Sequence, residues 1–197
     1  MVGRAAPGFA SRRAGTRAPE MRRSNFPLPA AALPACISRP ARYTEAMFDD
    51  IADLYQQVIL DHCKNPRNFR ELPGCTCTAE GRNPLCGDQL KLFLQMEGDT
   101  IRDAAFIGSG CCISKASASL LTDAVKGRTR AEAQQLFGLV RDMVTTGRAP
   151  GDVGKLAVFT GVHKYPARVK CAILAWHALT AALKGEAAPV STENERT

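Results

Sequence analysis

Asn83-Pro84-Leu85-Cys86-Gly87-Asp88 is the stretch around which the whole chain is organised. Its thiol and its carboxylate stand two residues apart with a glycine between them. Side chains at positions i and i+2 of an extended backbone point to the same side, and the glycine adds the freedom for a turn. Pro84 fixes its own φ and stiffens the approach. The stretch therefore predicts a thiol and a carboxylate that can close on one metal ion.

Two further cysteines occur in equally unusual settings downstream. Cys111 lies in Gly108-Ser109-Gly110-Cys111-Cys112-Ile113-Ser114, and Cys171 ends Tyr165-Pro166-Ala167-Arg168-Val169-Lys170-Cys171. Three thiols and one carboxylate form a four-ligand set that suits zinc or a cluster iron. Adjacent residues cannot both face one ion from a regular backbone, so Cys111 is assigned to the set. Cys112 is expected to be a small core residue or a spare thiol.

The surroundings of these thiols predict their charge. Cys111 and Cys171 are each expected in or beside the first turn of a helix, where the helix dipole and free amides lower the pKa of a thiol. Three thiolates and a carboxylate exceed the charge of a divalent ion, so cations are expected around the site. Arg168 and Lys170 flank the third cysteine and can supply them. The alternative is that both belong to a solvated, basic helix end.

The carboxylate also bears on the kind of metal site. Structural zinc sites typically use Cys and His in close pairs such as C-x₂-C, and this chain has no such pair. An oxygen ligand exchanges more readily than a thiolate. The set of Cys86, Asp88, Cys111 and Cys171 therefore favours a site that opens, frees a thiol and accepts cargo.

Composition restricts the class of protein. The net charge of +7 belongs mainly to residues 1–46, which carry +6, whereas residues 47–197 carry only +1. The charge therefore does not indicate a nucleic-acid partner. No apolar run is long enough for a membrane span or a signal peptide. The domain has ample apolar residues, so the eight cysteines favour a reduced, cytoplasmic protein with metal-binding thiols over a disulfide framework.

The N-terminal 46 residues are expected to be a disordered extension rich in Arg, Pro and Ala. Two alternatives stay open for this segment. It is faintly similar to an organelle transit peptide, or it precedes the natural start of the protein at Met47. Cys36 in this extension is given no role. Residues 186–197 are expected to be a polar C-terminal tail, which leaves 47–185 as the folded domain.

Hydrophobic spacing predicts helices at 48–64 and 113–125, a third helix capped by Thr129 with Glu132, and a last one from Pro166 to Lys184. Alternating residues predict strands at 90–96 and 100–107, joined as a hairpin. Residues 65–82 are expected to be a loop-rich connection, and Cys75 and Cys77 within it to be spare thiols. His62 is expected to be a helix-end residue rather than a ligand.

The motifs, taken together, resemble the NifU/IscU family of iron–sulfur cluster assembly proteins. The resemblance covers about residues 47–185 and rests on segments that occur in the family's order: Leu60-Asp61-His62 with Asn65-Pro66-Arg67-Asn68, then the Cys86 stretch, then Gly110-Cys111-Cys112-Ile113-Ser114 with Ala116-Ser117-Ala118-Ser119, then Ala167-Arg168-Val169-Lys170-Cys171. It is closest to the SufU branch, because Lys170 precedes the last cysteine and an extra helical segment spans about 127–150. Cys63, in place of an aromatic residue, and Cys112, in place of a small one, depart from the pattern, as does the extension 1–46.

The resemblance implies a compact α+β fold with a small antiparallel sheet packed with helices. It also implies a metal site of Cys86, Asp88, Cys111 and Cys171. In SufU-like proteins that site holds zinc, and the thiol matching Cys86 accepts persulfide sulfur from a SufS-like cysteine desulfurase. In the family more broadly it holds iron or a [2Fe–2S] cluster. Downstream iron–sulfur scaffolds or apo-protein acceptors are the further partners implied.

Three functions follow as hypotheses. The first is an assembly protein of the SUF system that accepts sulfur from a cysteine desulfurase; its status as an enzyme stays open, with a zinc-dependent sulfurtransferase as the activity considered. The second is a scaffold that assembles and transfers a [2Fe–2S] cluster. The third, from another class, is a small interaction module with a purely structural zinc.

Overall fold

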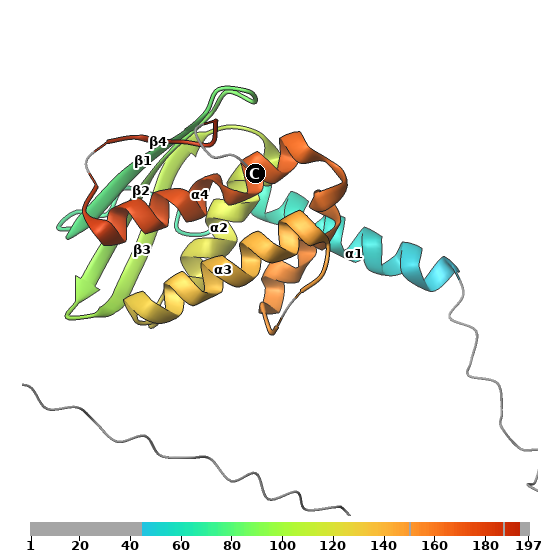
Figure 1. Cartoon of the computed structure of the whole chain (residues 1–197), viewed down its shortest axis with the longest axis horizontal. Coiled ribbons are helices and arrows are strands. Elements are labelled where there is room, and N and C mark those ends of the chain that lie inside the picture. The colour runs from blue at the N-terminus through green and yellow to red at the C-terminus, as the bar shows by residue number, and fades with distance from the viewer. Residues whose placement is uncertain (1–44, 150, 187, 194–197) are drawn as a thin grey trace, which may run out of the picture. The chain divides into compact units, whose positions relative to one another are not determined.

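The computed structural model describes residues 45–149, 151–186 and 188–193. Predictions for residues 1–44, including the disordered extension and the lack of a role for Cys36, lie outside this part. The described residues form an α+β fold, as predicted, in which helices pack on a four-stranded sheet (Figure 1).

The sheet has the strand order β3-β2-β1-β4. The predicted hairpin is confirmed: β2 (Asp88–Glu97) and β3 (Thr100–Ser109) pair antiparallel around a turn in which Gly98 has a φ of 60°. Leu90, Leu92 and Leu94 of β2 are buried in the main core, while Phe93 between them packs in a smaller cluster with Leu72 and Ala105. The alternation of β2 therefore buries side chains on both faces of the sheet.

Two strands lie where none was predicted. Strand β1 (Cys77–Asn83) occupies the end of the expected loop and pairs antiparallel with β2. Strand β4 (Val190–Ser191) lies in the expected polar tail and pairs parallel with β1. The buried positions of β1 include Ala79 and Gly81, which give no apolar pattern. They are small because α4 lies close: a Cβ on Gly81 would be 3.1 Å from Leu174 Cδ1.

The four α-helices match their predicted positions closely. They are α1 (Glu45–Lys64), α2 (Cys112–Val125), α3 (Arg130–Thr146) and α4 (Pro166–Lys184). Between α3 and α4 lies a 3₁₀ helix, η1 (Gly154–Lys164), that was not predicted. The predicted capping box at Thr129 and Glu132 is present, and α3 ends at Gly147 in the left-handed conformation. Helix α4 is buried along most of its length, with Trp176 fully enclosed.

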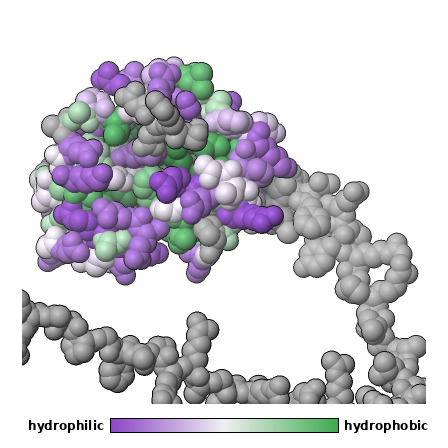
Figure 2. All heavy atoms as spheres, in the orientation of Figure 1, coloured by the Kyte–Doolittle hydropathy of each residue, from purple (hydrophilic) through white to green (hydrophobic). Residues whose placement is uncertain are grey.

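The core lies between the sheet and the helices. Helices α4 and α2 contact the sheet directly, and α4 runs across β1 and β2 (Figure 1). The face shown in Figure 2 mixes hydrophilic and hydrophobic side chains. In the part of the chain that the structure describes, no helix combines the length and apolarity needed to cross a membrane.

Candidate metal centre

The first two predicted ligands lie at the turn between β1 and β2. Asn83, the last residue of β1, pairs with Asp88, the first residue of β2. The Cys86 N–H donates to the Asn83 carbonyl oxygen (3.3 Å), and Gly87 has a φ of 68°, which a residue with a side chain rarely adopts. Cys86 is half-buried in this turn, whereas Asp88 is only 1% exposed. The tight turn therefore places the half-buried Cys86 thiol near the buried Asp88 carboxylate.

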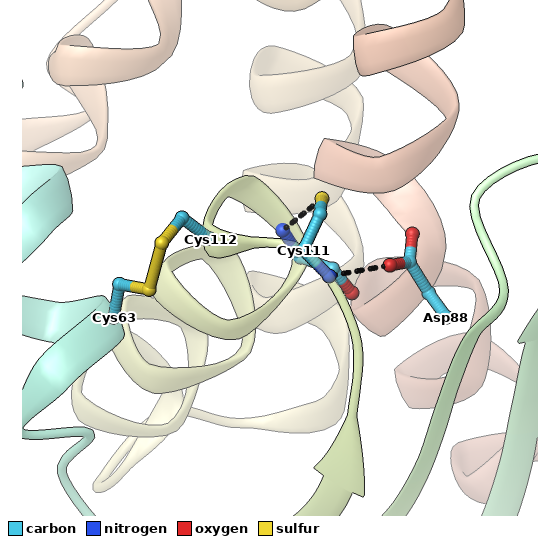
Figure 3. Close-up of a disulfide and its surroundings, with 5 residues drawn as sticks. Cys63, Asp88, Cys111 and Cys112 are labelled. Atoms are coloured by element: carbon cyan, nitrogen blue, oxygen red, sulfur yellow. Dashed lines mark hydrogen bonds between the residues drawn. A yellow bond between two sulfur atoms is a disulfide. The ribbon is translucent and has the colours of Figure 1, made fainter.

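The Asp88 carboxylate is held by two hydrogen bonds. Its Oδ1 accepts from the Cys111 backbone N–H (2.7 Å, Figure 3), and its Oδ2 accepts from Asn83 Nδ2 (3.2 Å). A Cβ on Gly110 would lie 2.5 Å from Asp88 Oδ1, so this approach requires a glycine. Burying a carboxylate is costly unless it is hydrogen-bonded. These hydrogen bonds offset the cost of burying Asp88, and the one from Cys111 joins the β1–β2 turn to the start of α2.

Cys111 is the N-cap of α2, and its Sγ accepts from the Ser114 N–H (3.5 Å). The pKa of its thiol is lowered to about 6, chiefly by a hydrogen bond with the Cys171 thiol; the Ser114 N–H lowers it further, while burial opposes the change. The prediction of a lowered pKa is confirmed. The helix start, which was the expected cause, makes the smaller contribution.

Cys171 differs from its prediction. It is the sixth residue of α4, so it lies in the second turn, beyond the free amides of the helix start. It is fully buried, and its Sγ lies 3.5 Å from the Ala167 carbonyl oxygen. The pKa of Cys171 is raised, first by its hydrogen bond with Cys111 and then by burial. The expected lowering of the Cys171 pKa is therefore wrong for the metal-free protein: the pKa of Cys111 is lowered, whereas that of Cys171 is raised.

The structure brings three of the four predicted ligands into one group. The Cys86 Sγ, a carboxylate oxygen of Asp88 and the Cys171 Sγ all lie within 4.8 Å of one another. Cys111 is not in this group, although its thiol is hydrogen-bonded to that of Cys171. Ligands of a tetrahedral zinc lie roughly 3.5–3.8 Å apart, from a Zn–S distance of about 2.3 Å. The side chains would therefore have to close by about 1 Å, and the assignment of all four as ligands remains a prediction.

The two predicted cations differ in their contacts. Arg168 is exposed in the first turn of α4, and its pKa is raised, first by the negative charge of Cys111 and then by a hydrogen bond with it. It therefore lies close enough to compensate the Cys111 thiolate. Lys170 is half-buried on the same helix, and its role remains a prediction.

Asn83 was quoted in the decisive stretch but was given no role. It is fully buried, and its Nδ2 donates both to Asp88 Oδ2 and to Cys171 Sγ (3.3 Å). Asn83 thus links two of the predicted ligands, Asp88 of β2 and Cys171 of α4. Its Oδ1 is buried without a hydrogen-bond partner among the described residues. A donor set of three thiols and a carboxylate, beside a polar atom left unpaired, fits a site for zinc or iron.

The remaining sulfur and imidazole groups lie elsewhere. Cys75 packs against the small cluster around Phe93, whereas Cys77 packs against the main core, so the two do not form a metal-binding pair. His62 is buried in the last turn of α1, and its Nδ1 is 2.8 Å from Ser119 Oγ. Burial lowers the pKa of its imidazole. The predictions of spare thiols and a helix-end histidine agree with these positions.

Sequence comparison places the chain among known proteins. A family model described as the NifU-like N terminal domain matches residues 54–185. The chain belongs to the NifU/IscU family. The predicted resemblance is thus confirmed, and it extends over α2, α3 and α4 together with the whole β2–β3 hairpin.

Relatives of this NifU/IscU-family protein include two curated bacterial proteins. The zinc-dependent sulfurtransferase SufU of Bacillus subtilis is 43% identical over 128 residues, which cover 64% of this chain and 86% of the relative. The iron–sulfur cluster assembly scaffold protein IscU of Streptococcus pyogenes is 40% identical over 136 residues, which cover 68% and 85%. The crystal structure of a putative SUF-system scaffold protein from Fervidobacterium islandicum matches with a TM-score of 0.62 and 33% identity, over 64% of this chain and 94% of that one.

The two cysteines that depart from the family pattern are bonded to each other. Cys63 in the last turn of α1 and Cys112 at the start of α2 form a disulfide, with their Cα atoms 4.9 Å apart (Figure 3). The expectation that all eight thiols are reduced, with Cys112 a small core residue or spare thiol, is therefore wrong. Packing of α1 against α2 brings the two residues within disulfide range. Nothing in their spacing of 49 residues indicates that contact.

Proposed function

We propose that this NifU/IscU-family protein is an iron–sulfur cluster assembly protein of the SUF system. It accepts sulfur from a SufS-like cysteine desulfurase at a metal site formed by Cys86, Asp88, Cys111 and Cys171. The observation that carries the proposal is the convergence of Cys86, Asp88 and Cys171 within 4.8 Å, with Cys111 joined to Asp88 by its backbone N–H (2.7 Å). The name of the Bacillus subtilis relative, a zinc-dependent sulfurtransferase, supports the same activity here.

The residues of the site have distinct roles in this proposal. A bound zinc ion supplies the positive charge that keeps the thiols deprotonated and in place. Cys171 must give up its proton when it becomes a ligand, because its pKa is raised in the metal-free protein. Asn83 orients Asp88 and Cys171 through its two donated hydrogen bonds. Arg168 compensates the negative charge at Cys111.

Cys86 is the thiol best placed to react. It lies half-buried in a turn next to Leu85, which is 59% exposed, whereas Cys171 is fully enclosed. The Cys86 thiolate attacks the outer sulfur of the partner's cysteine persulfide. A new S–S bond forms at Cys86, the partner's S–S bond breaks, and the partner's cysteine leaves as a thiolate. The protein then acts as a zinc-dependent sulfurtransferase in the cytoplasm and hands the sulfur to a downstream scaffold or apo-protein.

Replacing the reacting thiol tests this proposal. Cys86→Ser is mixed with a cysteine desulfurase and cysteine, and sulfide release and persulfide labelling are measured. Both should fall to the level of the desulfurase alone. Cys75→Ser is the matched control, because Cys75 is also half-buried but packs away from the site. If Cys86→Ser activates the desulfurase and carries persulfide as well as the control does, the proposal is wrong.

A second candidate function is the assembly of a [2Fe–2S] cluster as cargo on the same four residues. The names of the Streptococcus pyogenes and Fervidobacterium islandicum proteins, both scaffolds, favour it. Metal analysis after native purification under anaerobic conditions separates the two functions. Stoichiometric zinc supports sulfur transfer, whereas a coloured protein with iron and acid-labile sulfide supports the scaffold.

A further inference from the structure

The Cys63–Cys112 disulfide lies at the surface. Cys112 is exposed and Cys63 is half-buried. Thiol–disulfide exchange requires that an attacking thiolate reach one sulfur atom, and exposed disulfides are the labile ones. The position of this bond therefore indicates reversible chemistry rather than a permanent crosslink.

The fold does not depend on this bond for the contact between α1 and α2. Next to the disulfide, Ser119 Oγ of α2 binds both His62 Nδ1 and the Arg67 N–H, each at 2.8 Å. Asn68 Nδ2 donates to Thr122 Oγ1 (3.0 Å) and to Asp123 Oδ1 (2.8 Å). These bonds hold the end of α1 and the following segment against α2 whether or not the two sulfur atoms are joined. Both redox states are therefore compatible with the same fold.

The bond lies one residue from the candidate metal centre. Cys112 directly follows Cys111. The backbone N–H of Cys111 donates to Asp88, and its thiol interacts with that of Cys171. In Figure 3 the disulfide lies on one side of the start of α2, and the Cys111 thiol and Asp88 lie on the other. In the oxidised state Cys112 has no free thiol, and the residue after Cys111 is tethered to α1. In the reduced state the tether is gone and Cys112 carries a free thiol.

We propose that Cys63 and Cys112 form a reversible redox site that controls how fast the metal centre exchanges its ion. Two molecules of a thiol reductant of the glutathione class open the bond: their thiols become one disulfide, and Cys63 and Cys112 each take up one hydrogen. A disulfide oxidant of the glutathione class reverses the step. Reduction speeds exchange, because the start of α2, which carries Cys111, moves more freely once its tether to α1 is gone. The effect on exchange rests on the proposed metal centre, whereas the redox site itself does not.

The redox site is tested by counting thiols in the full chain. The protein is equilibrated in glutathione buffers from fully reduced to fully oxidised, quenched in acid, unfolded with a chelator present, alkylated and weighed. The eight cysteines should give eight alkylated thiols at the reduced end and six at the oxidised end, reversibly, with the bond mapped to Cys63 and Cys112 by digestion. Eight thiols under every condition, a bond between other cysteines, or a bond that glutathione cannot open would each overturn the proposal.

The control of exchange is tested on the same samples after removal of glutathione under anaerobic conditions. Zinc transfer to a chromogenic chelator should be at least threefold faster from the reduced protein. Cys63→Ser/Cys112→Ser should show one rate under all conditions, whereas Cys75→Ser/Cys77→Ser should keep the redox dependence. Equal rates from the two redox states of the unaltered protein would overturn the control of exchange. Failure to retain zinc in either state would overturn the zinc-bound centre and this control with it, while the thiol count would still decide the redox site.

Discussion

The hydrogen bond between Cys171 and Cys111 makes a quantitative prediction about thiol ionisation. In the metal-free protein the pKa of Cys111 is about 6 instead of the ordinary 9, and the Cys171 thiol is the largest cause. Cys171→Ala removes that donor and should raise the pKa of Cys111 toward 9. The Cys111 thiolate fraction at pH 7 should then fall from about 90% toward a few per cent, by the ordinary titration curve of a single acid. Cys171→Ser keeps an O–H donor at the same place and should keep the pKa low.

Alkylation measured against pH separates these outcomes. Metal-free protein is treated briefly with iodoacetamide between pH 5 and 10, and modification of Cys111 is followed by digestion and mass spectrometry. The midpoint should lie near 6 in the unaltered protein and in Cys171→Ser, and above 8 in Cys171→Ala. Cys75 provides an internal reference, since it packs outside the site. A midpoint above 8 in the unaltered protein, or one that Cys171→Ala leaves near 6, would show that the charge at Cys111 has another origin.

The stability of the metal-free protein should depend on pH between about pH 6 and 9, and five variants test other parts of the site and fold. Because the pKa of Cys111 is lowered on folding, the unfolded chain binds more protons between about pH 6 and 9. The urea midpoint should therefore rise as the pH increases through that range and level off below pH 6; a flat profile between pH 6 and 9 would contradict this. Asp88→Ala should still bind metal but exchange it faster in a chelator competition. Cys86→Ala should bind metal far more weakly, because it removes a thiolate. If both variants lost metal equally, Asp88 would be an anchoring ligand. Gly110→Ala should lower the free energy of unfolding in urea by about 1.5–3 kcal/mol, since its Cβ would displace the Asp88 carboxylate from its hydrogen bond. Gly138→Ala is the control, and it should not lower that free energy, because a Cβ there has no neighbour within 4 Å. Asn83→Leu, which removes both donated hydrogen bonds at similar volume, should lower metal affinity about 10–100-fold with an unchanged far-ultraviolet spectrum; unaltered affinity would refute its role.

Local sequence patterns predicted most of the secondary structure. The capping box at Thr129 and Glu132 and the alternation of β2 are properties of neighbouring residues, so they can be recognised without knowing the fold. Strand β1 was not predicted, because its buried positions are small where α4 lies close. Its placement depends on a contact with a residue more than ninety positions away.

The candidate site was predicted in its composition but not in its electrostatics. The residue types and the glycine of the Cys86 turn indicated which groups converge. The sequence could not show that Cys171 lies a full turn inside α4, nor that Asn83 points its amide at two ligands. The Cys63–Cys112 bond was missed for the same reason, because two helix ends must pack before either cysteine has a partner.

The two hydrogen bonds to Asp88 have a consequence for a protein that loads and unloads repeatedly. A carboxylate that loses its ion inside a protein is normally left as a bare charge, and small zinc domains unfold when this happens. Here the Asn83 side chain and the Cys111 amide satisfy the Asp88 oxygens without any ion, and a large apolar core holds the fold. The metal-free protein is therefore already folded, and in the proposed function each round of metal loading and transfer begins from the same conformation.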